Sequence, residues 1–151
     1  MPVLLLRFPL ALWVGGSVLA AMAAPVIFAA VPSRETAGRA FGEILRRFEG
    51  LKHGLSLALV IGVFQGVSRA GRVEGSAVVA AIAIFLAIAT NVYLSMVLRP
   101  RMGYFRKQAG SFDEIPEDDP WRRKFGHLHR RSVRVSMFGL LCAVVALWSA
   151  P

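Results

Sequence analysis

The sequence predicts an all-α membrane protein, built as an antiparallel bundle of four transmembrane helices in a single domain over residues 1–151. Two observations lead to this fold class. Hydrophobic residues make up 56% of the chain and charged residues 18%, which is more apolar than soluble domains usually are. The charged residues also gather in a few blocks, and the stretches between them are long enough to cross a bilayer as helices.

The first predicted span covers residues 8–31, which contain no charged residue. At roughly 1.5 Å per residue, such a helix crosses a hydrocarbon core of about 30 Å. Gly15 and Gly16, with the alanines that follow, form a small-residue surface on which a second helix can pack closely. Pro25 is expected to kink the helix near its far end.

A secretory signal peptide is an alternative interpretation of this first segment. Arg7 precedes the apolar run, and Ala21-Met22-Ala23 resembles a cleavage site. We favour a span, because the apolar run continues to Val31. Removing it would also leave an odd number of spans, whose charged connections would no longer fall on one side of the membrane.

The second and third predicted spans cover residues 51–68 and 76–98. The connection between them, residues 69–75, is so short that the two helices are expected to form an antiparallel hairpin. The fourth span is predicted at residues 132–149, where Arg134 is the one charged residue. Because Arg134 lies near the start of this span, its side chain can extend to the membrane interface.

The distribution of lysine and arginine predicts the orientation of the chain. Five of the 18 basic residues belong to the connection after the first span and ten to the connection after the third, which leaves three on the other side. The positive-inside rule therefore places both basic connections in the cytoplasm and both termini outside, in a bacterial inner membrane. The basic residues flank apolar runs, so membrane lipid and not nucleic acid is the expected partner. Those expected to face anionic headgroups are Arg46, Arg47, Arg130, Arg131 and Arg134.

Each basic connection has a pattern of its own. In the first, Phe41, Ile44, Leu45 and Phe48 recur at helical spacing among basic residues. This predicts a short amphipathic helix that lies in the cytoplasmic membrane interface between the first two spans. The other connection contains an acidic patch without the spacing of a calcium loop, so we expect a hydrated loop there. The patch consists of Asp113, Glu114, Glu117, Asp118 and Asp119.

Few polar residues lie inside the predicted spans. No aspartate, glutamate or lysine is expected deep in any of them, which gives no sign of a buried ion relay. Asn91 is the polar residue that we single out, and an interhelical hydrogen bond is its expected role. The single cysteine, Cys142, has no partner for a disulfide and serves as a small apolar filler. The chain contains none of the common catalytic motifs, so we expect no enzymatic activity.

Two histidines form a second candidate site. His53 begins the second span and His129 precedes the fourth, so their imidazoles are expected at similar depth. Histidines from two helices of a bundle can ligate a metal ion or haem. Interfacial histidines are more often solvated or hydrogen-bonded to the backbone, so no cofactor is the primary expectation and haem or metal the alternative.

Four fragments together resemble a known family: LWVGGSVLAAMAAPVIF, AGRAFGEILRRF, NVYLSMVLRPR and FGHLHRRS. They are similar to the small membrane proteins of domain of unknown function 4149, which are related to the eukaryotic transmembrane protein 205. The resemblance implies a four-helix membrane fold and no established reaction, and it favours His129 over His127. The chain departs from the family pattern after Ser132, where we would expect an asparagine. The residues that the resemblance marks are Gly15, Gly16, Pro25, Phe28, Asn91, Pro100, His129 and Ser132.

The sequence therefore predicts a non-enzymatic inner-membrane protein that is transport-related or an accessory subunit. The Gly and Ala surface of the first span also allows a homo-oligomer or a membrane partner. One alternative is a haem or metal protein that uses His53 and His129. Another is a structural module whose basic connections recruit anionic lipid or a partner.

Overall fold

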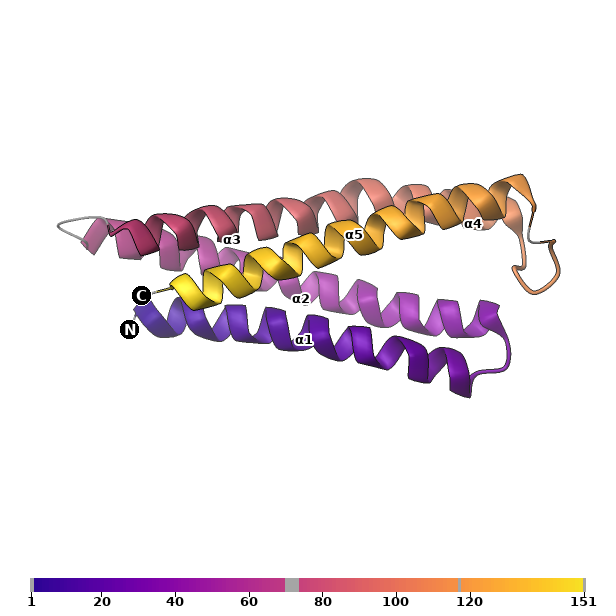
Figure 1. The fold of residues 1–151 in the computed structure, drawn as a ribbon, viewed down its shortest axis with the longest axis horizontal. Coiled ribbons are helices and arrows are strands. Elements are labelled where there is room, and N and C mark those ends of the chain that lie inside the picture. The colour runs from indigo at the N-terminus through magenta and orange to yellow at the C-terminus, as the bar shows by residue number, and fades with distance from the viewer. Residues whose placement is uncertain (1, 70–73, 117, 151) are drawn as a thin grey trace.

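The computed structural model describes residues 2–69, 74–116 and 118–150, and within them the chain is built from helices. The helix α3 (Gly75–Tyr93), the π-helical turn η1 (Leu94–Leu98) and α4 (Arg99–Ala109) follow one another without a break and form one long rod (Figure 1). The other elements are α1 (Pro2–Ala30), α2 (Arg34–Arg69) and α5 (Pro120–Ser149). The predicted all-α class is confirmed.

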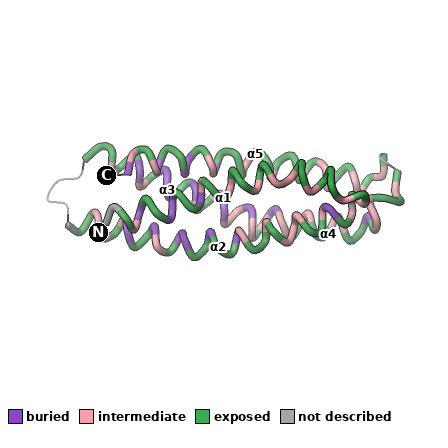
Figure 2. Tube along the Cα trace, turned by 90° about the horizontal axis from the view of Figure 1, so that it is seen from below, coloured by how far each residue is buried: buried purple, intermediate pink, exposed green. Residues whose placement is uncertain are grey.

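Four helical segments are long and apolar enough to cross a membrane, as predicted. They are Leu4–Ala30, Arg34–Ser68, Gly75–Ala109 and Pro120–Ser149. Large apolar side chains such as Phe64, Phe85 and Trp148 point outward and are exposed, and exposed residues run along all four rods (Figure 2). An apolar outer surface of this extent is typical of a protein that is surrounded by lipid.

The four rods pack side by side, with α1 between α2 and α5, and α3 between the same two helices. α2 and α5 are therefore a diagonal pair. The chain's two termini lie at one end of the bundle (Figure 1). The opposite end, which we call the basic end, carries residues 31–33, α4 and residues 110–116 and 118–119. The connection predicted at residues 69–75 falls largely on residues 70–73, which lie outside the described residues.

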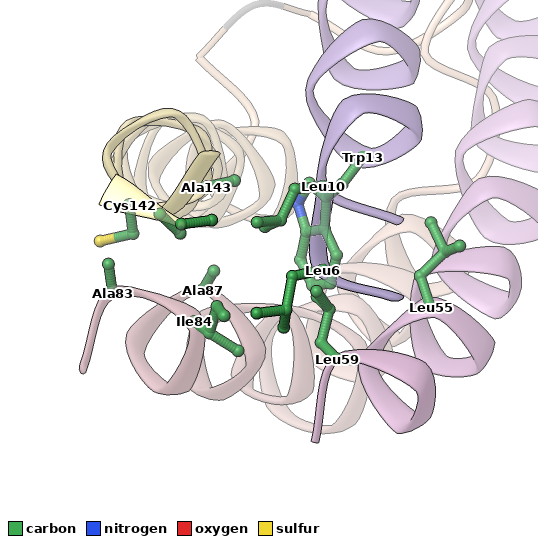
Figure 3. Close-up of a cluster of buried hydrophobic side chains, with 12 residues drawn as sticks. Leu6, Leu10, Trp13, Leu55, Leu59, Ala83, Ile84, Ala87, Cys142 and Ala143 are labelled. Atoms are coloured by element: carbon green, nitrogen blue, oxygen red, sulfur yellow. The ribbon is translucent and has the colours of Figure 1, made fainter. Parts of the chain in front are cut away.

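A cluster of buried apolar side chains forms the core near the chain termini (Figure 3). α1 and α2 contribute large side chains such as Leu10, Trp13 and Leu59, whereas α3 and α5 contribute mainly small ones such as Ala87 and Ala143. Small residues allow the backbones of α3 and α5 to approach closely. Cys142 is a buried member of the same cluster.

The structure differs from the prediction of a separate interfacial helix. Residues 41–48 belong to α2, which continues without interruption from Arg34 to Arg69. Gly50 is too weak a break, because one glycine costs a helix only about 1 kcal/mol. The apolar stripe also continues into the bundle, where the Phe48 ring packs against Gly16 of α1.

The rod formed by α3, η1 and α4 continues past the predicted end at Leu98. Pro100, the second residue of α4, cannot donate a backbone hydrogen bond, and its ring crowds the carbonyl four residues earlier. The wider π-helical turn of residues 94–98 lies directly before it and gives the ring space. The proline is thus accommodated inside the rod and does not end it.

The acidic patch supplies helix caps at the basic end. Asp119 Oδ1 accepts hydrogen bonds from the backbone N–H groups of Trp121 and Arg122, at 2.8 and 3.0 Å, and so caps α5. Asp113 Oδ2 accepts a hydrogen bond of 2.6 Å from Ser33 Oγ, which joins the loop before α5 to the start of α2. Asp119 explains why α5 begins at Pro120, 12 residues before the predicted fourth span. Glu117 of the same patch lies outside the described residues.

Candidate functional site

The polar side chains of the bundle interior meet at one small cavity, to which all four rods contribute. Its volume is about 10 Å³, which is the lower limit of the space that one water molecule needs. Five of its eight lining residues carry a polar side chain. The lining residues are Trp13, Ser17, Lys52, Thr90, Asn91, Leu94, Ser136 and Gly139.

Lys52 places a cation inside the bundle. Its side chain is only 7% exposed, and its Nζ atom lies 5.5 Å from the centre of the Trp13 ring and 5.0 Å from that of the Phe48 ring. Both distances are within the range of a cation–π interaction, which stabilises an ammonium group away from water. The two aromatic side chains come from α1 and α2, so they fix the ammonium group between these helices.

The burial of Lys52 corrects the expectation that no aspartate, glutamate or lysine lies deep in a span. Lys52, Leu55 and Leu59 are spaced at i, i+3 and i+7, so they share the face of α2 that turns into the bundle. Glu49, three residues before Lys52, is buried on the same face. This spacing is visible in the sequence, but Lys52 lies at the start of the predicted second span and was counted among the basic residues of the connection before it.

Glu49 forms an ion pair with Arg99, so its single negative charge is shared between two cations, Arg99 and Lys52. Arg99 of α4 donates a hydrogen bond to Glu49 Oε1 over 2.5 Å. The side chains of Glu49 and Arg99 are only 12% and 28% exposed. Because a partly buried carboxylate is costly without its partner, this pair ties α2 to α4. The charges of Glu49, Arg99 and Lys52 therefore add up to one net positive charge beside the cavity.

Asn91, the residue singled out in the sequence, is 1% exposed and lies beside His53. Its Nδ2 atom is 3.5 Å from His53 Nδ1, a long contact that joins α3 to α2. Its Oδ1 atom is buried and has no hydrogen-bond partner among the described residues. An unpaired buried oxygen costs about 1–3 kcal/mol, so this acceptor favours a donor in the adjoining cavity.

Two of the three hydroxyl groups beside the cavity, those of Ser17 and Thr90, donate their protons to backbone carbonyls and so offer acceptors to the cavity. Ser17 Oγ donates its proton to the carbonyl of Trp13 over 2.8 Å, and Thr90 Oγ1 donates to the carbonyl of Ala87 over 2.8 Å. Their lone pairs remain for other donors. The site therefore combines one ammonium group with several oxygen acceptors in a space of water size, which suits the binding of a small polar species or the exchange of a proton.

The structure does not bring His53 and His129 together. The two histidines belong to the diagonal helices α2 and α5. Thr90 of α3 faces Gly139 of α5, and His129 lies ten residues before Gly139, which is roughly 15 Å along the helix toward the basic end. His53, in contrast, lies beside Asn91, the neighbour of Thr90. The similar depth expected for the two imidazoles is thus absent.

His129 makes its contacts within α5. Its exposed ring stacks on Phe125 at 6.1 Å, and its backbone carbonyl accepts a hydrogen bond of 2.8 Å from Ser132 Oγ. No group of three or more potential metal ligands occurs among the described His, Cys, Asp and Glu residues. The histidine pair therefore has no shared binding site in this structure.

The residues predicted for helix packing and headgroup contact have different surroundings. The Phe48 ring occupies the space next to Gly16, whereas nothing lies within 4 Å of a Cβ built on Gly15. Pro25 is exposed. Arg46 and Arg47 both pair with Glu43, at 2.7 and 2.9 Å. The other three arginines of that set, at positions 130, 131 and 134 of α5, are exposed.

A family model describes most of this chain. It matches residues 8–111, which cover α1 from Phe8 onward, then α2, α3, η1, α4 and two following residues. The match includes Lys52, Asn91 and Arg99. It ends before α5, the helix that contains His129 and Ser132. The finer likeness to transmembrane protein 205 stays a prediction. No curated protein and no solved structure matches the chain. Since the matched residues make up more than half of the sequence, the chain belongs to the family defined as a domain of unknown function (DUF4149).

Proposed function

We propose that this protein is a non-enzymatic, transport-related protein of a bacterial inner membrane, with a small ion as the species that its polar cavity binds. One observation carries the proposal: Lys52, an ionisable side chain, is buried where the four membrane-crossing rods meet. Ionisable groups inside a membrane bundle are costly, and they commonly mark a path for ions or protons.

The charges around Lys52 support this role. Glu49 is already paired with Arg99, so a purely structural ion pair does not account for the lysine. The unpaired Oδ1 of Asn91 is a second polar atom without a structural partner among the described residues. A bundle that needed only stability would gain more from apolar side chains at both positions. Lys52 and Asn91 are therefore the residues to which we assign ion binding.

We further propose that the four rods cross the membrane antiparallel to one another, with the basic end in the cytoplasm. The excess of lysine and arginine in the connections at that end supports this orientation. The cavity has room for one water molecule at most, so an ion path needs a rearrangement, a second copy or a partner. Exposed Gly15 offers such a chain a close contact on α1.

Ion flux into liposomes tests the proposal. Purified protein is reconstituted, and the fluxes of protons, chloride and potassium are followed with ion-selective fluorescent dyes. We expect flux of one of these ions with the natural chain and a loss of at least tenfold with Lys52→Met, which keeps the length of the side chain but removes its charge. Lys107→Met is the matched control, because Lys107 is exposed on α4.

Asn91→Leu provides a second, independent test of the same site. It removes the unpaired oxygen at nearly constant volume and should reduce the same flux. Circular dichroism and melting in detergent establish that each variant is folded before its flux is compared. Absence of flux for all three ions, or equal flux in the natural chain and in folded Lys52→Met, would refute the proposal.

A further inference from the structure

A second hollow lies on the outer surface, between α3 and α5. It has a volume of about 420 Å³, within the range of small-molecule sites. Its lining is mostly apolar, with one cationic side chain, Arg134. The residues that form it are Leu86, Ala89, Thr90, Tyr93, Arg134, Val135 and Phe138. We call it the α3–α5 groove.

The groove exists because a small side chain lies between large ones. Leu86, Ala89 and Tyr93 follow one another at spacings of three and four residues on α3, so they share one face of the helix. Ala89 leaves space between its two larger neighbours, and Phe138 and Val135 of α5 form the opposite wall. Both helices are among the four that are able to cross a membrane, so the groove opens toward lipid.

Positive charge collects at the end of the groove that is nearer to the basic end. Arg134 lines the groove there, and the guanidinium of Arg131 lies 5.6 Å from the centre of the Tyr93 ring. In the described part of the chain, no carboxylate forms an ion pair with either arginine, whereas Glu43 pairs with both Arg46 and Arg47. The rim of the groove therefore carries two arginine side chains without a carboxylate partner among the described residues, and it is suited to binding an anion.

The order of these features matches the shape of a lipid. From Arg134 and Tyr93 to Leu86 the groove extends along α3 by about two turns, or roughly 10 Å, away from the basic end. A phospholipid whose phosphate lies at that end of the bundle would direct its acyl chain along this line. Arg134 lies within the apolar segment of α5, where an anionic partner reduces the cost of its charge.

We infer that the α3–α5 groove binds one acyl chain of an anionic phospholipid whose phosphate pairs with Arg134 and Arg131. This inference requires the four rods to span a membrane, but it does not depend on ion transport through the cavity. It narrows the general contact with headgroups expected from the basic residues to one lipid at one place.

Native mass spectrometry of the detergent-purified full chain tests this inference. Phosphatidylglycerol and phosphatidylcholine with identical acyl chains are titrated separately, and the fraction of protein that carries one lipid is measured. We expect tighter binding of phosphatidylglycerol and a loss of about fivefold in its affinity for each arginine removed in Arg131→Gln and Arg134→Gln. Arg46→Gln with Arg47→Gln is the matched control and should leave the affinity unchanged, because these arginines lie on α2 and do not line the groove.

A variant that fills the groove distinguishes binding of the acyl chain from binding of the headgroup. Ala89→Phe should reduce binding of both lipids, since it takes the space of the acyl chain. Equal affinity for the two lipids, or unchanged binding in the folded double arginine variant or in folded Ala89→Phe, would overturn the inference. A protein dimer that forms without lipid and is lost in Ala89→Phe would overturn it as well, because the occupant would then be a second copy of the chain.

Discussion

Replacing Gly139 by alanine is expected to destabilise the contact between α3 and α5 beside the polar cavity. A Cβ atom at this position would overlap with Thr90 Oγ1 and lie 3.3 Å from Thr90 Cβ. Thr90 cannot turn its hydroxyl away without losing its hydrogen bond to the Ala87 carbonyl. Overpacking of this kind costs about 1–3 kcal/mol, while alanine in place of glycine in a helix regains up to about 1 kcal/mol. The net loss should therefore lie between about 0 and 3 kcal/mol.

Gly15→Ala is the matched control, since it makes the same chemical change in the interior of a helix. Nothing lies within 4 Å of a Cβ at Gly15, so this variant should show only the gain in helix stability. The two variants should then differ by about 1–3 kcal/mol. For a chain of this length, 1 kcal/mol shifts the melting temperature by about 2–4 °C. Thermal unfolding in mild detergent, followed by circular dichroism, measures this difference.

A second substitution tests whether the cost arises at the proposed contact. Thr90→Ala removes the hydroxyl and the methyl group that Gly139→Ala would meet, so the cost of Gly139→Ala should fall in the Thr90→Ala background. The reasoning is refuted if Gly139→Ala melts at the same temperature as Gly15→Ala. It is also refuted if the cost of Gly139→Ala is the same with and without Thr90.

Two further predictions concern the ion pair and the orientation. Arg99→Gln leaves the Glu49 carboxylate buried without its partner and should lower the free energy of unfolding by about 3 kcal/mol. Combining it with Glu49→Gln should recover part of that loss. An equal loss in the single and the double variant would contradict an ion pair. The orientation is tested in a Cys142→Ala background, which removes the natural cysteine. Ser33→Cys at the basic end should not react with a membrane-impermeant thiol reagent applied from outside the cell, whereas Ser149→Cys near the C-terminus should react. The reverse pattern would contradict the proposed orientation.

The sequence by itself determined the class of the fold. The length and apolar character of a membrane-crossing helix are local properties, so four charge-poor runs were enough to predict four such helices. Helix boundaries were predicted less well. α2 and α5 begin far before the apolar runs, because Gly50 is a weak break and because Asp119 caps α5 from the acidic patch.

Asn91 was found from the sequence because an amide inside an apolar run is conspicuous. Its neighbour His53, and the unpaired Oδ1 atom, became known only from the way α2 and α3 are rotated against each other. The pairing of His53 with His129 was expected because both precede a span. Two residues that each precede a predicted span can still lie at different depths along the bundle. His53 and His129 also belong to the diagonal helices α2 and α5, which do not pack against each other.

Tertiary structure alone decided that Lys52 is a cation of the interior and not one of the basic residues outside. In the sequence it follows the four arginines of the first connection and precedes an apolar run, as an interfacial lysine does. Whether its face of α2 turns inward depends on where Trp13, Phe48 and Asn91 lie in space. That is a property of four helices packed together, because the environment of a charge is set by its neighbours in space and not by its neighbours along the chain.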